Sequence, residues 1–267
     1  LLALAVMFTG CSAPAESESG AALPDVVGSM DIRYAEQFSV DYLADGSALA
    51  EVADGRRYLI IPDGGEVPEQ LPEDVTVISQ PENIYLASSS SMDLFSSLDC
   101  LGDILASSTP ESGWKLPEIA QAMADEDILY AGKYSSPDIE LLMSEGCDLA
   151  IENMMIYHSP KTAEQIESCG IPVFIERSSA ESHPLGRLEW VRLYGLMLGK
   201  SDEAEKFFSE KCSLLDEVTS RESTGCTAAF FYISSNGSAV VRKPGDYISK
   251  MIELAGGCLL YTSPSPR

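Results

Sequence analysis

Short apolar runs alternate with amphipathic segments between residues 84 and 198, and this alternation constrains the fold more than any other feature. The apolar runs predict strands at residues 84–87, 104–106, 128–130, 149–151 and 173–175. The segments around them predict helices at residues 92–101, 116–124, 137–145, 161–168 and 185–198. Such alternation is typical of βαβ units around a mainly parallel sheet. We therefore predict an α/β fold.

Capping and turn residues mark the ends of several of these helices. Ser90 and Asp93 have the spacing of a capping box at the start of the first helix. Pro137 suits the first position of the helix that follows the third strand, and Gly146 lies just beyond its last turn. These signals support the predicted boundaries.

Residues 201–221 carry the longest helical pattern in the sequence. Apolar residues recur on one face, at Ala204, Phe207, Phe208, Leu215 and Val218. Ser201 is a candidate N-cap, and the acidic residues after it complement the helix dipole. A helix of this length spans about 30 Å, roughly the diameter of a small domain. It fits either an ordinary surface helix or a bridge between two lobes, and periodicity alone favours the surface helix.

The two ends of the sequence differ from this pattern. Residues 1–11 read as the later part of a secretory signal, and without an initiating Met the reading frame is expected to be cut there. The FTGC motif that ends at Cys11 resembles a bacterial lipobox, which implies lipid modification of Cys11. Residues 12–29 have the composition of a flexible tether. The final stretch, residues 258–267, breaks the pattern abruptly, and we interpret it as an artefactual tail.

Two further regions flank the alternating part. Residues 30–80 predict a β-rich segment with strands at 57–61 and 75–78. After the long helix, the sequence predicts strands at 227–234 and 239–242 and a helix at 246–255. Residues 222–257 are too few for a complete domain, so we expect a second lobe that is only begun in this chain.

Charge and motifs exclude several functions. The net charge of −25 disfavours nucleic acid as a partner. The two histidines, His158 and His183, are too few for a His-rich metal site. The nucleophile elbow, the phosphate loop and the dinucleotide fingerprint are missing from the sequence. We predict a binding protein without a resident metal or cofactor.

Ligands of open α/β sheets bind at the carboxyl ends of the strands, which directs attention to the loops there. Their hydroxyl, amide, thioether, aromatic and cationic groups suit a bulky organic ligand with polar edges. Met154 and Met155 could instead fill the core. The candidate ligand residues are Ser89, Ser90, Met92, Trp114, Lys133, Tyr134, Asn153, Met154, Tyr157, Arg177, Ser235, Asn236 and Arg242.

Two stretches carry a family resemblance. YSSPDIE at residues 134–140 and LMSEGCDLAI at residues 142–151 together resemble a signature of iron-complex and cobalamin substrate-binding proteins of ABC importers. Residues 84–98, 183–190 and 230–237 resemble one clostridial-type branch of that family. The resemblance covers residues 31–257, and it departs from the signature at Cys147, where the family has Pro.

The resemblance implies two α/β lobes joined by a long helix, with the ligand in the cleft between them. It therefore favours the bridge for residues 201–221. The predicted organisation is a signal remnant with lipobox at 1–11, a tether at 12–29, an N-terminal lobe at 30–200, the bridge at 201–221, the start of a C-terminal lobe at 222–257 and the tail at 258–267.

The resemblance also implies function and partners. We expect a monomeric, extracytoplasmic lipoprotein, held on the bacterial membrane by its lipid anchor alone, that delivers a siderophore complex, haem or cobalamin to an ABC importer. Glu140 matches the glutamate with which the family docks on its permease, and Glu189 is a second candidate for that role. Two alternatives stay open, a secreted two-lobed hydrolase or metal enzyme and a sensor-type binding module.

Overall fold

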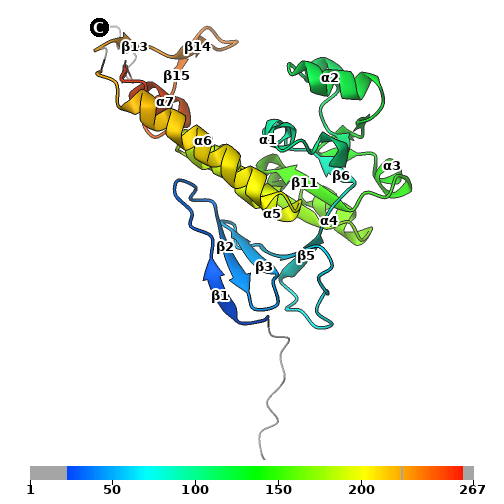
Figure 1. Cartoon of the computed structure of the whole chain (residues 1–267). Helices are drawn as coiled ribbons and strands as arrows, with labels where there is room; N and C mark the ends of the chain where they lie inside the picture. The colour runs from blue at the N-terminus through cyan, green and yellow to red at the C-terminus, as the bar shows by residue number, and fades with distance from the viewer. Residues whose placement is uncertain (1–22, 224, 261–267) are drawn as a thin grey trace, which may run out of the picture.

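A computed structural model describes residues 23–223 and 225–260 of the chain. The predicted signal remnant, Cys11 and most of the predicted tether lie outside these residues. Two five-stranded sheets and a layer of helices make up most of the described chain (Figure 1).

The first sheet is mainly antiparallel. It consists, in spatial order, of β1 (Val26–Ser29), β2 (Phe38–Leu43), β3 (Ala48–Val52), β4 (Arg57–Ile61) and β5 (Val75–Ser79). Strands β1 to β4 pair antiparallel, and β5 pairs parallel to β4. Gly55 has φ +87° in the tight turn between β3 and β4, a conformation that glycine adopts without strain. Strand β1 lies within the range predicted as tether, which is thus a strand from Val26 onward.

The second sheet is entirely parallel, which confirms the predicted fold class. Its spatial order is β12 (Val173–Glu176), β11 (Leu149–Asn153), β6 (Ile84–Leu86), β7 (Ile104–Ser107) and β8 (Leu129–Tyr130). Each neighbouring pair is parallel. The carboxyl ends of all five strands therefore meet at one edge, which we call the carboxyl edge.

Seven α-helices surround the sheets in the described chain. They are α1 (Met92–Ser97), α2 (Pro117–Ala124), α3 (Ile139–Ser144), α4 (Pro160–Ser168), α5 (Pro184–Met197), α6 (Ser201–Thr219) and α7 (Tyr247–Leu254). Four 3₁₀ turns complete the loops, at η1 (Leu101–Asp103), η2 (Glu111–Gly113), η3 (Met154–His158) and η4 (Ser178–Ala180).

One predicted cap and one predicted helix start are wrong in detail, although α1 begins at Met92 as predicted. Ser91 occupies the N-cap of α1 without a capping hydrogen bond from its side chain, and the Ser90 hydroxyl donates to Glu176 Oε2 at 3.2 Å instead. Pro137 belongs to β10 (Ser136–Pro137), which pairs with β9 (Gly132–Lys133). Helix α3 therefore begins later, and Asp138 caps it by accepting from the Leu141 N–H at 3.0 Å.

One hydrophobic core joins the two sheets through α5. Trp190 is fully buried, and its ring lies 5.0 Å from that of Phe38 on β2 and 6.2 Å from that of Phe174 on β12. Aromatic pairs at such distances add to the free energy gained by burying their surface. The N-terminal sheet is thus an integral part of the lobe.

Helix α6 is long, as predicted, and packs against α5 at a close crossing. Gly195 makes this possible, because a Cβ atom there would lie only 2.8 Å from the carbonyl oxygen of Lys200 and would also meet the Ala204 side chain. The buried residues of α6 are Ala204, Phe208 and Cys212. Lys200, and not Ser201, is the N-cap. The last turns of α6 extend away from the parallel sheet toward the C-terminal strands (Figure 1).

The C-terminal part has little regular structure of its own. The predicted strand at 227–234 is divided into β13 (Thr227–Ala228) and β14 (Phe231–Ile233). Strand β14 pairs antiparallel with β15 (Ala239–Val241), and β13 pairs parallel with β16 (Cys258–Leu259). Strand β16 falls in the range interpreted as an artefactual tail, and residues 261–267 lie outside the described chain.

Candidate functional site

A buried carboxylate ties two loops together at the carboxyl edge. Glu176, the last residue of β12, is fully buried. Its Oε2 accepts hydrogen bonds from the hydroxyls of Ser88, at 2.8 Å, and Ser90, at 3.2 Å. Its Oε1 accepts from the Ser178 N–H at 2.6 Å. Because a buried carboxylate needs several donors, these bonds fix the loops after β6 and β12 relative to each other.

Asn153 fixes a third loop at the same edge. Its Nδ2 donates to the Ala87 carbonyl at 3.1 Å, and its Oδ1 accepts from the Met155 N–H at 2.8 Å. The Ser108 hydroxyl, after β7, donates to the same Ala87 carbonyl at 3.0 Å. The loops after β6, β7 and β11 are therefore ordered before a ligand binds. Binding then costs less conformational entropy.

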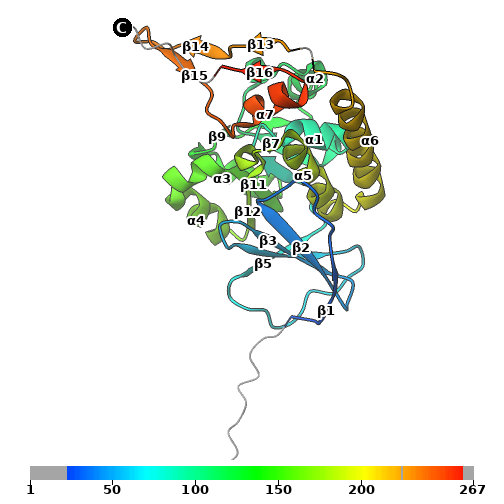
Figure 2. The ribbon, with the colours of Figure 1, turned by 90° about the vertical axis from the view of Figure 1, so that its left-hand side faces the viewer.

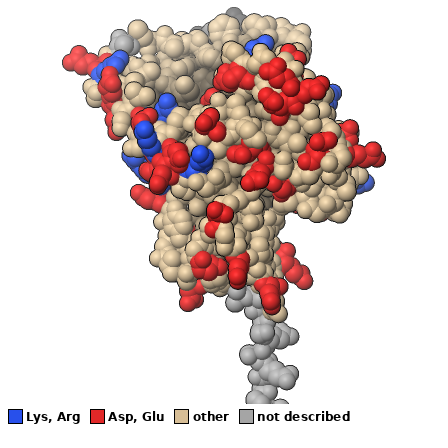
Figure 3. Space-filling model, turned by 45° about the vertical axis from the view of Figure 1, so that its right-hand side comes forward, with Lys and Arg blue, Asp and Glu red and all other residues tan. Residues whose placement is uncertain are grey.

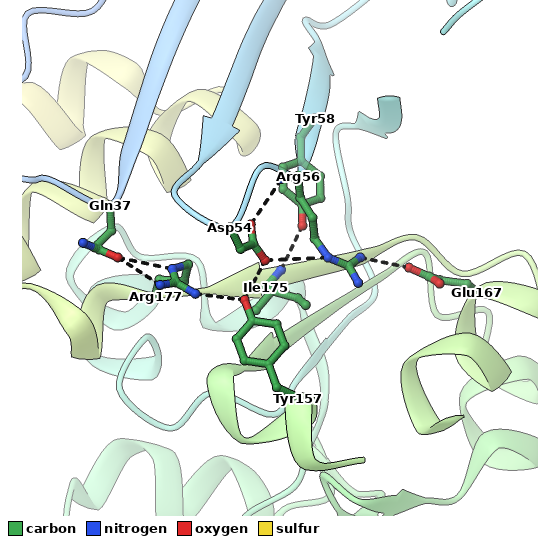
Figure 4. Close-up of polar contacts among 8 residues, drawn as sticks. All are labelled: Gln37, Asp54, Arg56, Tyr58, Tyr157, Glu167, Ile175 and Arg177. Atoms are coloured by element: carbon green, nitrogen blue, oxygen red, sulfur yellow. Dashed lines mark hydrogen bonds and ion pairs between the residues drawn. The ribbon is translucent and has the colours of Figure 1, made fainter. Parts of the chain in front are cut away.

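Arg177 and Tyr157, both predicted ligand residues, are brought together at one corner of this edge (Figure 4). The Arg177 Nη1 donates to the Tyr157 hydroxyl at 3.0 Å. Its Nε and Nη2 both donate to Gln37 Oε1, at 3.3 and 3.1 Å. The Tyr157 hydroxyl donates to Asp54 Oδ2 at 2.6 Å. Gln37 and Asp54 belong to the N-terminal sheet, so two segments more than a hundred residues apart build this corner.

Tyr58 on β4 and Arg56 just before it contact β12 and α4. Tyr58 is buried and its hydroxyl accepts from the Ile175 N–H at 3.2 Å, which satisfies a donor that an edge strand would otherwise leave open. Arg56 forms an ion pair with Glu167 at 3.3 Å. Burial raises the pKa of Tyr157, and its hydrogen bond to Asp54 acts in the same direction, so the phenol remains a donor.

The other candidates near the parallel sheet divide into exposed and packed residues. Ser89 and Lys133 are exposed, whereas Met154 is half-buried. Tyr134 is half-buried against the core cluster under α3 and α4. Trp114 packs on the main core, and its indole N–H donates to the Thr109 carbonyl at 3.2 Å.

Met92 is a wrong prediction. The side chain is fully buried in the core, because it is the first residue of α1 and faces the sheet. It therefore cannot contact a ligand at the carboxyl edge.

The three candidates of the C-terminal hairpin do not join the edge cluster. Ser235 and Asn236 lie in the turn between β14 and β15, where Asn236 Oδ1 accepts from the Ser238 N–H at 3.2 Å. Arg242 forms an ion pair with Asp246 at 3.2 Å. Figures 1 and 2 both show this hairpin apart from the parallel sheet.

Glu189 is not a docking residue, which corrects the prediction. Its carboxylate is 0% exposed, and it accepts from the N–H groups of Arg33, Tyr34 and Ala35 at 2.8, 2.7 and 2.8 Å. Arg192 also forms an ion pair with it at 3.0 Å. A surface partner cannot reach such a group. Glu140, by contrast, is exposed in the first turn of α3.

Glu181 completes the arrangement around Glu189. It is buried and accepts from the N–H groups of Glu36, at 2.8 Å, and Gln37, at 3.0 Å, and from the Trp190 indole at 3.0 Å. The backbone donors of residues 33–37 are thus all bound by two carboxylates near α5. This acidic clamp, as we call Glu181 and Glu189, attaches the N-terminal sheet to the lobe.

Surface charge and cavities supply less information. Acidic side chains are spread over the face shown in Figure 3, with fewer basic ones among them. An apolar groove of about 320 Å³ lies between α5, α6 and α7, lined by residues that include Leu188, Leu215 and Met251. Within the described residues, no helix has the length and apolar character needed to cross a membrane, and no group of three His, Cys, Asp or Glu side chains is arranged to hold a metal ion.

Known proteins with a related sequence are few among those compared. No protein-family model matches the sequence. An uncharacterized lipoprotein of Methanocaldococcus jannaschii is 23% identical over 218 residues, which are 75% of this chain and 51% of that protein. The chain therefore spans about half the length of the curated relative that it matches.

Several solved structures share the fold of this chain. An ABC-transporter substrate-binding protein of Listeria monocytogenes has a TM-score of 0.51 at 18% identity, over 70% of this chain and 67% of that one. The petrobactin-binding protein of Bacillus subtilis has a TM-score of 0.57 at 12% identity, over 80% and 66%. A periplasmic haem-binding protein of Vibrio cholerae has a TM-score of 0.56 at 17% identity, over 69% and 67%. The chain has the α/β fold of periplasmic substrate-binding proteins. The solved structures that share it include binding proteins for a siderophore and for haem.

Proposed function

We propose that this chain is the ligand-binding part of an extracytoplasmic protein that captures an iron complex and delivers it to an ABC importer. The observation that supports this most is the combination of a parallel-sheet lobe with the long helix α6, in the fold of substrate-binding proteins. The role is binding and not catalysis.

The ligand class follows from the chemistry of the carboxyl edge. Exposed hydroxyls at Ser89 and Ser90, the phenol of Tyr157 and the guanidinium of Arg177 suit a ligand that has both flat apolar surfaces and polar edges. A siderophore complex or haem has this character, and cobalamin is the third candidate. The clostridial-type branch remains a prediction.

Location and delivery form the second part of the proposal. The relative named as a lipoprotein supports a lipid anchor, which we assign to Cys11. Glu140 is exposed at the tip of α3 and is the proposed contact with the permease. With Glu189 buried, we assign no second contact among the described residues.

A binding panel on the natural full-length protein tests the function. We expect saturable binding of haemin, a ferric siderophore or cobalamin, observed as a rise in Tm and as quenching of tryptophan fluorescence. The Glu140→Gln variant changes an exposed residue. It should leave ligand binding unaltered and reduce uptake by the reconstituted importer. If none of the three chelates binds, the function is wrong.

A further inference from the structure

Arg177 is one of the described arginines without a direct ion pair, and the acid in its hydrogen-bond network, Asp54, lies beyond the Tyr157 hydroxyl. The described residues include five arginines in ion pairs with Asp or Glu, namely Arg56, Arg57, Arg192, Arg221 and Arg242. Arg177 forms no ion pair with a carboxylate of the described chain, because its hydrogen bonds go to the neutral oxygens of Gln37 and Tyr157. This occurs although the chain has 42 acidic and 17 basic side chains.

The guanidinium also has donors to spare. An arginine has five N–H groups. The Nε–H and one N–H of Nη2 bind Gln37, and one N–H of Nη1 binds Tyr157. This leaves one N–H on each terminal nitrogen without a hydrogen bond to the described residues. Free N–H donors of a guanidinium can bind the oxygens of a carboxylate, a partner that arginine favours.

Both acceptors of Arg177 are themselves held in place by the N-terminal sheet. The Gln37 N–H donates to the buried carboxylate of Glu181 at 3.0 Å, and its carbonyl accepts from the Ala53 N–H at 2.9 Å. Tyr157 is held through its hydroxyl by Asp54 at 2.6 Å. The guanidinium is therefore fixed from both sides before any ligand arrives (Figure 4).

We propose that Gln37 and Asp54 are positioning residues that hold Arg177 as the anion-binding group of the carboxyl edge, and that the ligand presents a carboxylate to it. The N-terminal sheet is then part of the binding site. That this carboxylate is part of an iron chelate rests on the proposed function.

The Gln37→Glu variant is the sharpest test, because it keeps the acceptor oxygen and the side-chain shape but adds a carboxylate that cancels the charge of Arg177. Citrate serves as the anion probe, followed through the side-chain Nε–H resonance of Arg177 in ¹⁵N-arginine-labelled protein. We expect citrate to shift this resonance saturably, and Gln37→Glu to weaken its affinity roughly tenfold. The exposed Gln165→Glu variant, with the same change of charge on α4, should bind citrate as the wild type does.

The Tyr157→Phe variant tests the role of Asp54, because it removes the hydroxyl that links Asp54 to Arg177. We expect several-fold weaker citrate binding and an altered Arg177 resonance in the free protein. Equal citrate affinity in Gln37→Glu and wild type would overturn the inference. So would haemin binding, measured by its absorbance, without any citrate effect on Arg177, although the proposed function would then stand. A citrate effect on Arg177 without binding of any iron chelate would support the anion site and contradict the proposed function.

Discussion

At the scale of single residues, the burial of Glu152 has a consequence for stability. It lies on β11 with its side chain fully buried, and neither carboxylate oxygen has a hydrogen-bond partner among the described residues. The hydroxyl of Tyr85, on the neighbouring strand β6, also lacks one. Burial raises the pKa of Glu152 from 4.5 to about 8, so the side chain is uncharged in the folded protein at neutral pH.

This shift predicts a pH-dependent stability. Between pH 4.5 and about 8 the unfolded chain loses the Glu152 proton while the folded chain keeps it, so the free energy of unfolding falls as the pH rises. Glu152→Gln removes this contribution. In urea denaturation, the free energy of unfolding of Glu152→Gln minus that of the wild type should increase by up to about 1.4 kcal/mol for each pH unit across that range. The exposed Glu164→Gln control should show no such trend, and parallel profiles for Glu152→Gln and wild type would contradict the prediction.

The buried Glu189 gives a second prediction at this scale. Removing its carboxylate in Glu189→Ala leaves three backbone donors without their acceptor and removes one of the two ion pairs of Arg192. We expect a loss of about 3 kcal/mol or more in the free energy of unfolding, measured with urea. Glu140→Ala on the surface should change stability by less than about 0.5 kcal/mol. Similar small effects for both variants would show that the clamp contributes little.

At the scale of elements, the close crossing of α5 and α6 depends on Gly195. Gly195→Ala places a methyl group against the Lys200 carbonyl and Ala204, so the helices must move apart. We expect a loss of about 1–3 kcal/mol, seen as a lower Tm. Gly102→Ala is the matched control, because no atom lies within 4 Å of the added Cβ and its φ is not in the left-handed region. An unchanged Tm for Gly195→Ala would mean that the crossing adapts without cost.

The parallel sheet and its helices could be predicted because each strand is a short apolar run with a helix before the next one. The antiparallel sheet was predicted only in part, since β1 has the small, weakly apolar sequence VVGS and all four residues are exposed. Pro137 misled the prediction of α3, because it suits a strand at an edge as well as a helix start.

The candidate site was harder to predict than the fold. Strand order placed Arg177, Tyr157 and Asn153 at one edge of the sheet, as the structure has them, whereas their role as ligand residues stays a prediction. Sequence could not reveal Gln37 and Asp54, whose partners lie 140 and 103 residues away in the chain. Glu189 was predicted as a docking residue from the resemblance, and its burial is an exception, because acidic residues are usually exposed. Glu176 was missed although it is the last residue of the apolar strand β12, a position that could have identified it.

At the scale of the whole molecule, the three core clusters of the described chain draw their buried residues from residues 38–212. Residues 220–223, just after α6, are exposed, and Arg221 is accessible to trypsin. We expect early tryptic cleavage after Arg221, leaving a lobe whose circular dichroism and melting differ little from those of the intact chain. Mass spectrometry of a time course identifies the cut. Loss of the lobe's cooperative melting after this cut would show that α7 and its neighbours stabilise it.

The acidic clamp also determines when the lobe can be completed. Its donors, residues 33–37, meet Glu181 and Glu189, which follow 144 to 156 residues later in the chain. During synthesis the first sheet therefore emerges long before the helix that holds it. Such distant pairings are slow to form. The early chain thus remains unanchored until α5 is available, which fits the extracytoplasmic location that we propose.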